Sequence, residues 1–151
     1  MNNVLFISIK PQYVARILDG SKTVELRKNM PSIKVGCMIL LYSTSPVKKV
    51  VAICELEGVI DSTPNEIWSN LSDKLGINEK DYFDYYQNSK RAVALNLKNV
   101  TKFDESINLS QIRTKIPGFS PPQTYKYFKA MALKSLFENE YSEVLKKMHL
   151  T

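Results

Sequence analysis

The chain has 151 residues, of which 44% are hydrophobic and 24% are charged, which is the size and composition of one globular domain. This composition excludes intrinsically disordered and low-complexity classes of protein. Its net charge of +6 at pH 7 is modest for a nucleic-acid-binding protein, so the distribution of the charge matters more than its total.

The charge is distributed unevenly along the chain. Residues 10–49 hold eight Lys or Arg against two Asp or Glu, residues 50–89 hold two against eight, and residues 90–151 hold eleven against five. One acidic segment between two basic ones is expected if one face of the fold is electropositive. Ordinary surface lysines on a solvated face would give the same counts.

The side chains on which many enzymes and metal sites rely are scarce. His149 is the only histidine, which excludes Ser/His/Asp and Cys/His catalysis and any zinc site built on several histidines. Cys37 and Cys54 lie in apolar runs without a Cys-x-x-Cys spacing, so we expect buried free thiols, with a disulfide as the alternative. We expect no metal and no cofactor. Because no apolar run approaches about 18 residues and no signal-like segment opens the chain, we expect a soluble, cytoplasmic protein that does not enter a membrane.

The beginning of the chain predicts a strand, a short helix and a second strand. Residues 4–9 are rich in β-branched and aromatic side chains, and Pro11 follows at a position that suits the first turn of a helix. Apolar residues within 14–18 form one helical stripe, and Gly20 ends it. The second strand begins at Thr23.

This second strand concentrates charge. Alternation of side chains puts Glu25 and Arg27 on one face of the strand and Val24 and Leu26 on the other, while Lys22 lies in the turn before it. The carboxylate and the guanidinium start about 6 to 7 Å apart at the backbone, close enough to bind each other or one ligand. On this pattern alone, a surface ion pair worth about 0 to 1 kcal/mol is the simpler interpretation.

The middle of the chain predicts two strands and two helices. Residues 37–42 are apolar at both odd and even positions, as expected of a strand covered on both faces, and residues 50–60 form another strand. A capping box predicts a helix from residue 63 to about residue 75, and Asn78 begins a second helix that carries four aromatic residues. Aromatic residues at helical spacing usually belong to the core, and we expect a few of these to border a pocket.

The last third predicts one more long strand and a terminal helix. Residues 91–103 alternate as a strand, 109–114 form a turn or short helix, and 116–125 are irregular because they contain three prolines and a glycine. Residues 131–151 form an amphipathic helix that packs on, or is appended to, a domain of residues 1–130. About five strands with helices between them, and no regular βαβ alternation, predict an α+β fold built on a small mixed barrel.

The eight residues 20–27, Gly-Ser-Lys-Thr-Val-Glu-Leu-Arg, resemble the Gly-x-Lys-x-x-Glu-x-Arg motif of ASCH domains, a branch of the PUA-like superfamily. The resemblance continues in residues 5–11, 40–46, 83–86 and 121–125, so it covers most of the chain. It implies an α+β fold with a PUA-like mixed β-barrel of about five to six strands and flanking helices. It also implies a cleft between the mouth of the barrel and the helices.

The resemblance further implies a protein that binds RNA and holds a nucleotide or a modified base in this basic cleft. Cations and hydrogen-bonding groups would hold phosphates and base edges, and tyrosines would stack a splayed base. The residues that we expect to contact the nucleic acid are Lys10, Lys22, Glu25, Arg27, Tyr42, Ser43, Tyr86, Gln123 and Tyr125.

Two other functions remain open. Some ASCH proteins are similar to acetylcytidine amidohydrolases and others resemble ribonucleases, and in either enzyme Lys22 and Glu25 would be the catalytic residues. Glu25 takes the place of the amidohydrolase threonine, which argues against that reaction. The third hypothesis is a non-catalytic regulatory adaptor whose basic face binds a protein partner. In each case we expect a monomer rather than a dimer.

Overall fold

The structure, a computed structural model, describes residues 3–129 and contains six strands and four α-helices within that range. The strands are β1 (Asn3–Ile9), β2 (Val24–Arg27), β3 (Met38–Ser43), β4 (Lys49–Ser62), β5 (Ala92–Asn108) and β6 (Tyr125–Lys129). The helices are α1 (Pro11–Asp19), α2 (Pro64–Leu71), α3 (Glu79–Tyr85) and α4 (Leu109–Lys115), with a 3₁₀ turn at Ser72–Lys74. The predicted C-terminal helix, the domain boundary after residue 130 and His149 lie outside the described residues.

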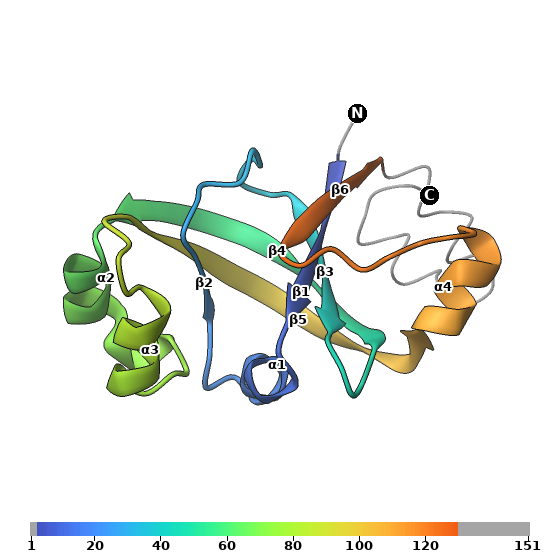
Figure 1. Cartoon of the computed structure of the whole chain (residues 1–151), viewed down its shortest axis with the longest axis horizontal. Coiled ribbons are helices and arrows are strands. Elements are labelled where there is room, and N and C mark those ends of the chain that lie inside the picture. The colour runs from blue at the N-terminus through green and yellow to red at the C-terminus, as the bar shows by residue number, and fades with distance from the viewer. Residues whose placement is uncertain (1–2, 130–151) are drawn as a thin grey trace.

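All six strands form one mixed sheet in the order β2-β5-β4-β3-β1-β6. β1 and β3 are parallel, and every other neighbouring pair is antiparallel. The long strands β4 and β5 run side by side across the molecule, with α2 and α3 at one end and α4 at the other (Figure 1). The predicted α+β fold with five to six strands is confirmed. The sheet is not closed, because β2 and β6 stand at its two edges.

The sheet is covered on both faces at its centre. Even-numbered residues of β1 and β3, such as Phe6 and Leu40, pack in a core cluster that also contains Ile112 of α4. Odd-numbered residues, such as Ile7 and Ile39, pack in a second cluster with the apolar stripe of α1. The central residues of both strands, 4–7 in β1 and 38–42 in β3, are therefore apolar on both faces, as the sequence predicted for residues 37–42.

A third core cluster fixes the motif strand. Val24 and Leu26 of β2 pack with Ile67 of α2, with Leu75 and with Tyr82 of α3. Thr63 caps α2 and Asn78 caps α3, as predicted. This packing holds the apolar side of β2 and leaves its charged side toward α1 and β1.

Three parts of the chain differ from prediction. The helix predicted over 63–75 ends at Leu71 and continues as the 3₁₀ turn, and the strand predicted over 91–103 extends to Asn108. β6 begins at Tyr125, the last residue of the segment predicted to be irregular. β6 is short and half-exposed, and it follows two prolines, so its pattern is weak. No helix within residues 3–129 is long and apolar enough to cross a membrane.

The two cysteines are free thiols, as predicted. Cys54 is fully buried, and this burial raises the pKa of its thiol to about 12. Cys37 is partly buried, and its thiol pKa is also raised.

Candidate functional site

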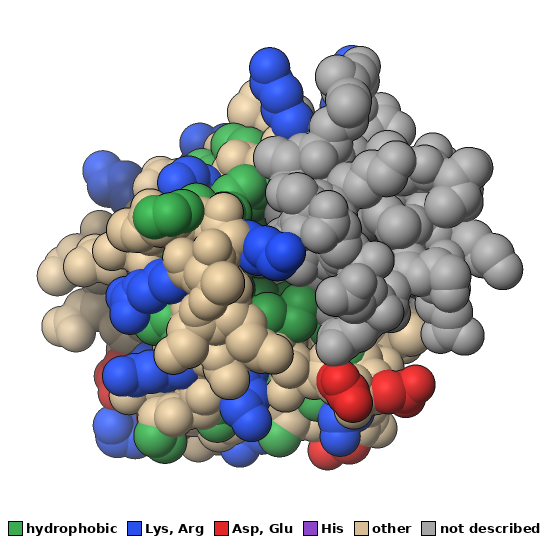
Figure 2. Space-filling model, turned by 90° about the vertical axis from the view of Figure 1, so that its right-hand side faces the viewer, with side chains coloured by type: hydrophobic (Ala, Val, Ile, Leu, Met, Phe, Trp, Pro, Cys, Tyr) green, Lys and Arg blue, Asp and Glu red, His purple; other side chains and the backbone are tan. Residues whose placement is uncertain are grey.

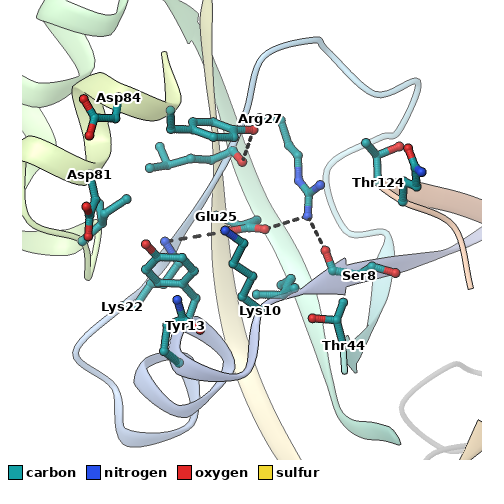
Figure 3. Close-up of a pocket in the computed structure, with 16 residues that line it drawn as sticks. Ser8, Lys10, Tyr13, Lys22, Glu25, Arg27, Thr44, Asp81, Asp84 and Thr124 are labelled. Atoms are coloured by element: carbon teal, nitrogen blue, oxygen red, sulfur yellow. Dashed lines mark hydrogen bonds and ion pairs between the residues drawn. The ribbon is translucent and has the colours of Figure 1, made fainter. Parts of the chain in front are cut away.

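A cleft of about 780 Å³ lies beside β2. Its walls come from the end of β1, the start of α1, the motif strand β2, the helix α3 and residues 123–124, which precede β6. Figure 3 shows Asp81 and Asp84 of α3 on one side and Ser8, Thr44 and Thr124 on the other, with the motif side chains between them. The cleft thus gathers segments that are far apart in sequence.

Lys22 lies at the floor of the cleft and is only 3% exposed, although it belongs to the turn before β2. Its Nζ donates a hydrogen bond to the carbonyl oxygen of Leu75 at 2.6 Å, lies 3.8 Å from Glu25 Oε1, and sits 5.4 Å from the centre of the Tyr13 ring. Burial lowers the pKa of Lys22, and the nearby Glu25 carboxylate opposes this shift.

Glu25 joins two cations. Its Oε2 accepts a hydrogen bond from Arg27 Nη2 at 2.7 Å while its Oε1 faces Lys22. We call Lys22, Glu25 and Arg27 the charge chain. The charge chain carries two positive charges and one negative charge, and each of its side chains is nearly or fully shielded from solvent, with 3%, 9% and 11% exposed. It is therefore a positively charged site in a surrounding of low dielectric constant, where electrostatic interactions are strong.

Arg27 also connects two strands that do not pair. The same Nη2 donates to the carbonyl oxygen of Ser8 in β1 at 3.1 Å, which links β2, at one edge of the sheet, to β1 (Figure 3). Its Nε is buried, and within the described part of the chain no group accepts a hydrogen bond from it. A buried guanidinium N–H without an acceptor is uncommon.

The two sides of the cleft carry opposite charge. Lys10, exposed at the start of α1, adds a cation on the side of the charge chain. Asp81 and Asp84, exposed on α3, add carboxylates on the other side. A ligand in the cleft can therefore meet cations and hydrogen-bond acceptors at once.

The structure brings five of the predicted contact residues together in the cleft. They are Lys10, Lys22, Glu25, Arg27 and Gln123. Ser43 is buried at the end of β3, next to the cleft residue Thr44, and does not line the cleft itself. Tyr125 is outside the cleft too, in β6, where it pairs with Ile7 and its ring lies against that of Tyr127.

Tyr42 cannot stack a base where the structure places it, which corrects the prediction. It is 2% exposed, and its ring stacks on Phe6 at 5.4 Å in the core cluster near α4. The physical reason is the alternation of side chains along β3, which points Tyr42 to the face opposite α1.

Tyr86 is likewise buried, at 3% exposure, and its hydroxyl donates to the carbonyl oxygen of Arg27 at 3.0 Å. The preceding residue, Tyr85, lines the cleft instead and is 38% exposed. Neighbouring residues of a helix point about 100° apart. A prediction that is wrong by one position therefore selects a ring buried in the core in place of the ring that lines the cleft. The Lys28 Nζ lies 4.9 Å from the centre of the Tyr85 ring.

The sequence analysis missed several cleft residues. Tyr13, Tyr85 and the two carboxylates of α3 are the most important of them. Tyr13 follows Lys10 by three positions, so helical spacing could have placed both on one side of α1. Its pKa is raised, mainly by burial. Within residues 3–129, no group of three or more His, Cys, Asp or Glu is placed to bind a metal ion.

Basic side chains also occur outside the cleft. In Figure 2, which views the molecule from the side of α4, Lys and Arg are scattered over the described part of the surface, and Asp and Glu gather near its lower edge. The positive charge on this side is thus dispersed. The charge chain differs because its cations are buried together at the floor of a cleft.

Comparison with known proteins gives one family model and several similar sequences. The family described as "Domain of unknown function (DUF365)" matches residues 2–118. An "ASCH domain-containing ribonuclease" of Zymomonas mobilis is 31% identical over 123 residues, which cover 82% of this chain and 82% of that protein. A large ribosomal subunit protein uL22 of Ureaplasma parvum is 34% identical over 116 residues, which cover 76% of this chain but 37% of that longer protein.

Solved structures agree with these relatives. The crystal structure of ASCH from Zymomonas mobilis superimposes with a TM-score of 0.84 at 29% identity, covering 89% of this chain and 94% of that one. The sequence motif, the open six-stranded sheet with its helices and these matches all agree. The chain belongs to the ASCH domain family and has its PUA-like α+β fold.

Proposed function

We propose that this protein binds single-stranded RNA and holds one nucleotide in the cleft beside β2. The observation that carries the proposal is the charge chain, a net positive site shielded from solvent at the floor of a cleft that also has an exposed aromatic ring in its wall. Cations hold phosphate oxygens, and aromatic rings stack unpaired bases.

The roles follow from position. Lys10 at the rim and Arg27 at the floor hold phosphate oxygens. Tyr85 stacks the base, in place of the buried Tyr42 and Tyr86. Asp81 on the opposite side accepts a hydrogen bond from an amino group of the base. A base within a duplex is stacked and paired, so single strands and loops should bind better than an A-form duplex.

A second function, cleavage of the bound RNA, is favoured by the relative named as a ribonuclease. In the proposed reaction, the 2′-hydroxyl attacks the neighbouring phosphorus, its proton passes to Glu25, the O2′–P bond forms and the P–O5′ bond breaks. The leaving 5′-oxygen takes up a proton from water, the other product ends in a 2′,3′-cyclic phosphate, and Glu25 returns its proton to the solvent. Lys22 and Arg27 stabilise the negative charge that develops on the phosphate oxygens.

One experiment separates these functions. Labelled RNA of about 12 nucleotides, single-stranded or paired with its complement, is mixed with the protein, and binding is followed by fluorescence anisotropy while products are followed on gels. Tight binding of the single strand without product supports a binding module, and product that is lost in Lys22→Ala supports the nuclease. Acetylcytidine is included as a substrate for the amidohydrolase alternative, against which Glu25 argues.

The same measurements can contradict the proposal. If the parent retains neither single-stranded nor duplex RNA at about 50 mM salt, RNA binding is wrong. Binding of a protein partner that hardly responds to salt would favour the adaptor instead. The monomeric state and the cytoplasmic location expected from the sequence are part of the same proposal, and analytical ultracentrifugation tests the first of them.

A further inference from the structure

Lys22 is held from one side by the turn between α2 and α3, which lies more than fifty positions further along the chain. Within this turn, the carbonyl oxygen of Leu75 accepts the 2.6 Å hydrogen bond from Lys22 Nζ. The carbonyl oxygen of Lys74 accepts a 3.0 Å hydrogen bond from the backbone N–H of Thr23. The turn therefore contacts both the side chain of Lys22 and the backbone next to it.

Gly76 is the point of closest approach. It has a φ of +58°, and a Cβ atom built on it would lie 2.5 Å from Lys22 Cβ and 3.0 Å from Lys22 Cγ. Contacts this short do not occur between real carbon atoms, so any side chain at position 76 must displace Lys22 or the turn. Glycine is thus required here for two reasons, its backbone conformation and the space that Lys22 fills.

The turn is itself fixed from two directions. Arg16 Nη1 of α1 donates to the carbonyl oxygen of Gly76 at 2.6 Å, and the carbonyl oxygen of Arg16 accepts from the backbone N–H of Lys22 at 3.0 Å. Leu75 is fully buried in the core cluster beneath β2. α1, the turn and the motif lysine therefore form one interlocked unit.

We propose that Gly76 is a positioning residue for the site, because the absence of a side chain at this position lets the turn hold the Lys22 ammonium group buried between the Leu75 carbonyl and Glu25. The inference rests on the proposed function only for the importance of Lys22 to RNA. The position of Lys22 itself can be tested without RNA.

The test is a titration of the Lys22 side chain in the full chain. Lysines are labelled with ¹³C at Cε, the Lys22 signal is assigned by its loss in Lys22→Met, and its pKa is compared between the parent, Gly76→Ala and Gly118→Ala. Gly118 is the matched control, since its φ is +76° but nothing lies within 4 Å of a Cβ built on it. Both substitutions place alanine at a positive φ, but only the methyl group at position 76 would contact Lys22.

We expect Gly76→Ala to raise the pKa of Lys22 toward its ordinary value, because the displaced ammonium regains water. Gly118→Ala should leave that pKa as in the parent. A folded Gly76→Ala protein with the Lys22 titration of the parent would overturn the inference. So would an equal shift in Gly118→Ala.

If Gly76→Ala does not fold, the inference is tested with the double variant that combines Lys22→Gly and Gly76→Ala. Removing the Lys22 side chain removes the two nearest atoms that the new methyl group meets and leaves only Lys22 Cα, at 3.2 Å, so the double variant should fold as Lys22→Gly alone does, with at most a small loss of stability. Failure of the double variant to fold, with Lys22→Gly folded, overturns the inference.

RNA binding is then measured for the same proteins. A parent that binds RNA, with affinity lowered about tenfold in Gly76→Ala and unchanged in Gly118→Ala, connects the position of Lys22 to function. A parent that binds no RNA contradicts the proposed function and leaves the titration result intact. The two hypotheses can therefore fail separately.

Discussion

Two regions of this molecule use the same kinds of residue in opposite surroundings. In the charge chain, Arg27 and Glu25 make one hydrogen bond of 2.7 Å with about 90% of each side chain buried. At the end of the sheet near α2, Arg91 binds Asp61 through both its Nε and its Nη2, yet these side chains are 48% and 43% exposed. The exposed pair makes two hydrogen bonds and the buried pair makes one.

The two pairs differ most in burial, and we expect burial, rather than the number of hydrogen bonds, to determine how strongly stability depends on an ion pair. Water solvates Arg91 and Asp61 whether or not they meet, so their pairing adds little to stability. The charge chain gives up its solvation on folding, so each member depends on the others. Apolar residues at these positions would stabilise the fold at least as well. Buried cations held ready beside a cleft are therefore more readily explained by a ligand than by stability.

The largest effect is expected from Glu25→Gln. This change keeps the shape of the side chain and removes the one negative charge between Lys22 and Arg27, leaving two buried cations uncompensated. We expect the free energy of unfolding, measured in urea, to fall by about 3 to 5 kcal/mol. Asp61→Asn is the matched control in the exposed region, and the unfolding curve should barely move. Equal effects from both substitutions would contradict the comparison.

The next effect concerns two adjacent rings of α3. Tyr85→Ala should weaken the binding of single-stranded RNA by about 1 to 3 kcal/mol, because the cleft loses its stacking surface. It should also lower stability, because the Tyr85 ring packs on that of Tyr86 and its hydroxyl donates to the carbonyl oxygen of Leu26. Tyr86→Phe should leave RNA affinity unchanged, and it removes the hydrogen bond to Arg27 at a cost of about 1 kcal/mol of stability. Anisotropy titrations and urea unfolding on both variants measure the contrast. An RNA affinity equal to that of the parent in Tyr85→Ala would remove Tyr85 from the site.

The charge chain could be predicted from the sequence because its three residues are close together in the chain. Lys22, Glu25 and Arg27 lie within six residues, and strand alternation puts the last two on the same side. The helix caps at Thr63 and Asn78 were predictable for the same reason. The burial of Lys22 was not, because it depends on the turn at residues 74–76, which meets β2 only in the folded chain.

The errors have the same physical origin. Nothing in the pattern of β3 says which of its two apolar faces meets α1, so Tyr42 was assigned to the cleft when it belongs to the core near α4. Tyr85 and Tyr86 are distinguished only by how α3 is rotated against β2. Local spacing predicts which residues share a face, and tertiary packing decides what that face contacts.

The third effect is a dependence of stability on pH. Burial holds the pKa of Lys22 below its ordinary 10.5, so between these two values the unfolded chain binds a proton that the folded chain does not. The contribution of Lys22 to the free energy of unfolding must therefore rise with pH through this window. The total rise is about 1.4 kcal/mol for each unit by which the pKa of Lys22 is lowered. Below the lowered pKa this contribution is constant.

Lys22→Met removes this titration and keeps most of the side-chain volume. The difference in free energy of unfolding between the parent and Lys22→Met, measured in urea at several pH values up to about 10.5, should change in favour of the parent as the pH rises. Tyrosines remote from Lys22 titrate alike in both proteins and cancel, and because the Tyr13 ring contacts Lys22, the comparison is repeated in a Tyr13→Phe background. A difference that is independent of pH would show that the lysine is solvated in the folded state.

The smallest effect is expected at the rim of the cleft, from Lys10→Ala. Lys10 is exposed and contributes as a solvated charge, so its removal should lower RNA affinity only slightly at physiological salt. Its contribution is better seen in the slope of log affinity against log salt, which should become shallower by about 0.7 if Lys10 neutralises one phosphate of a single strand. Lys90→Ala removes another exposed lysine, one that does not line the cleft, and as the control it should leave the slope as it is. If both variants make the slope shallower by the same amount, the phosphates of RNA are bound by the dispersed surface charge of the molecule, and the cleft is not the preferred binding site.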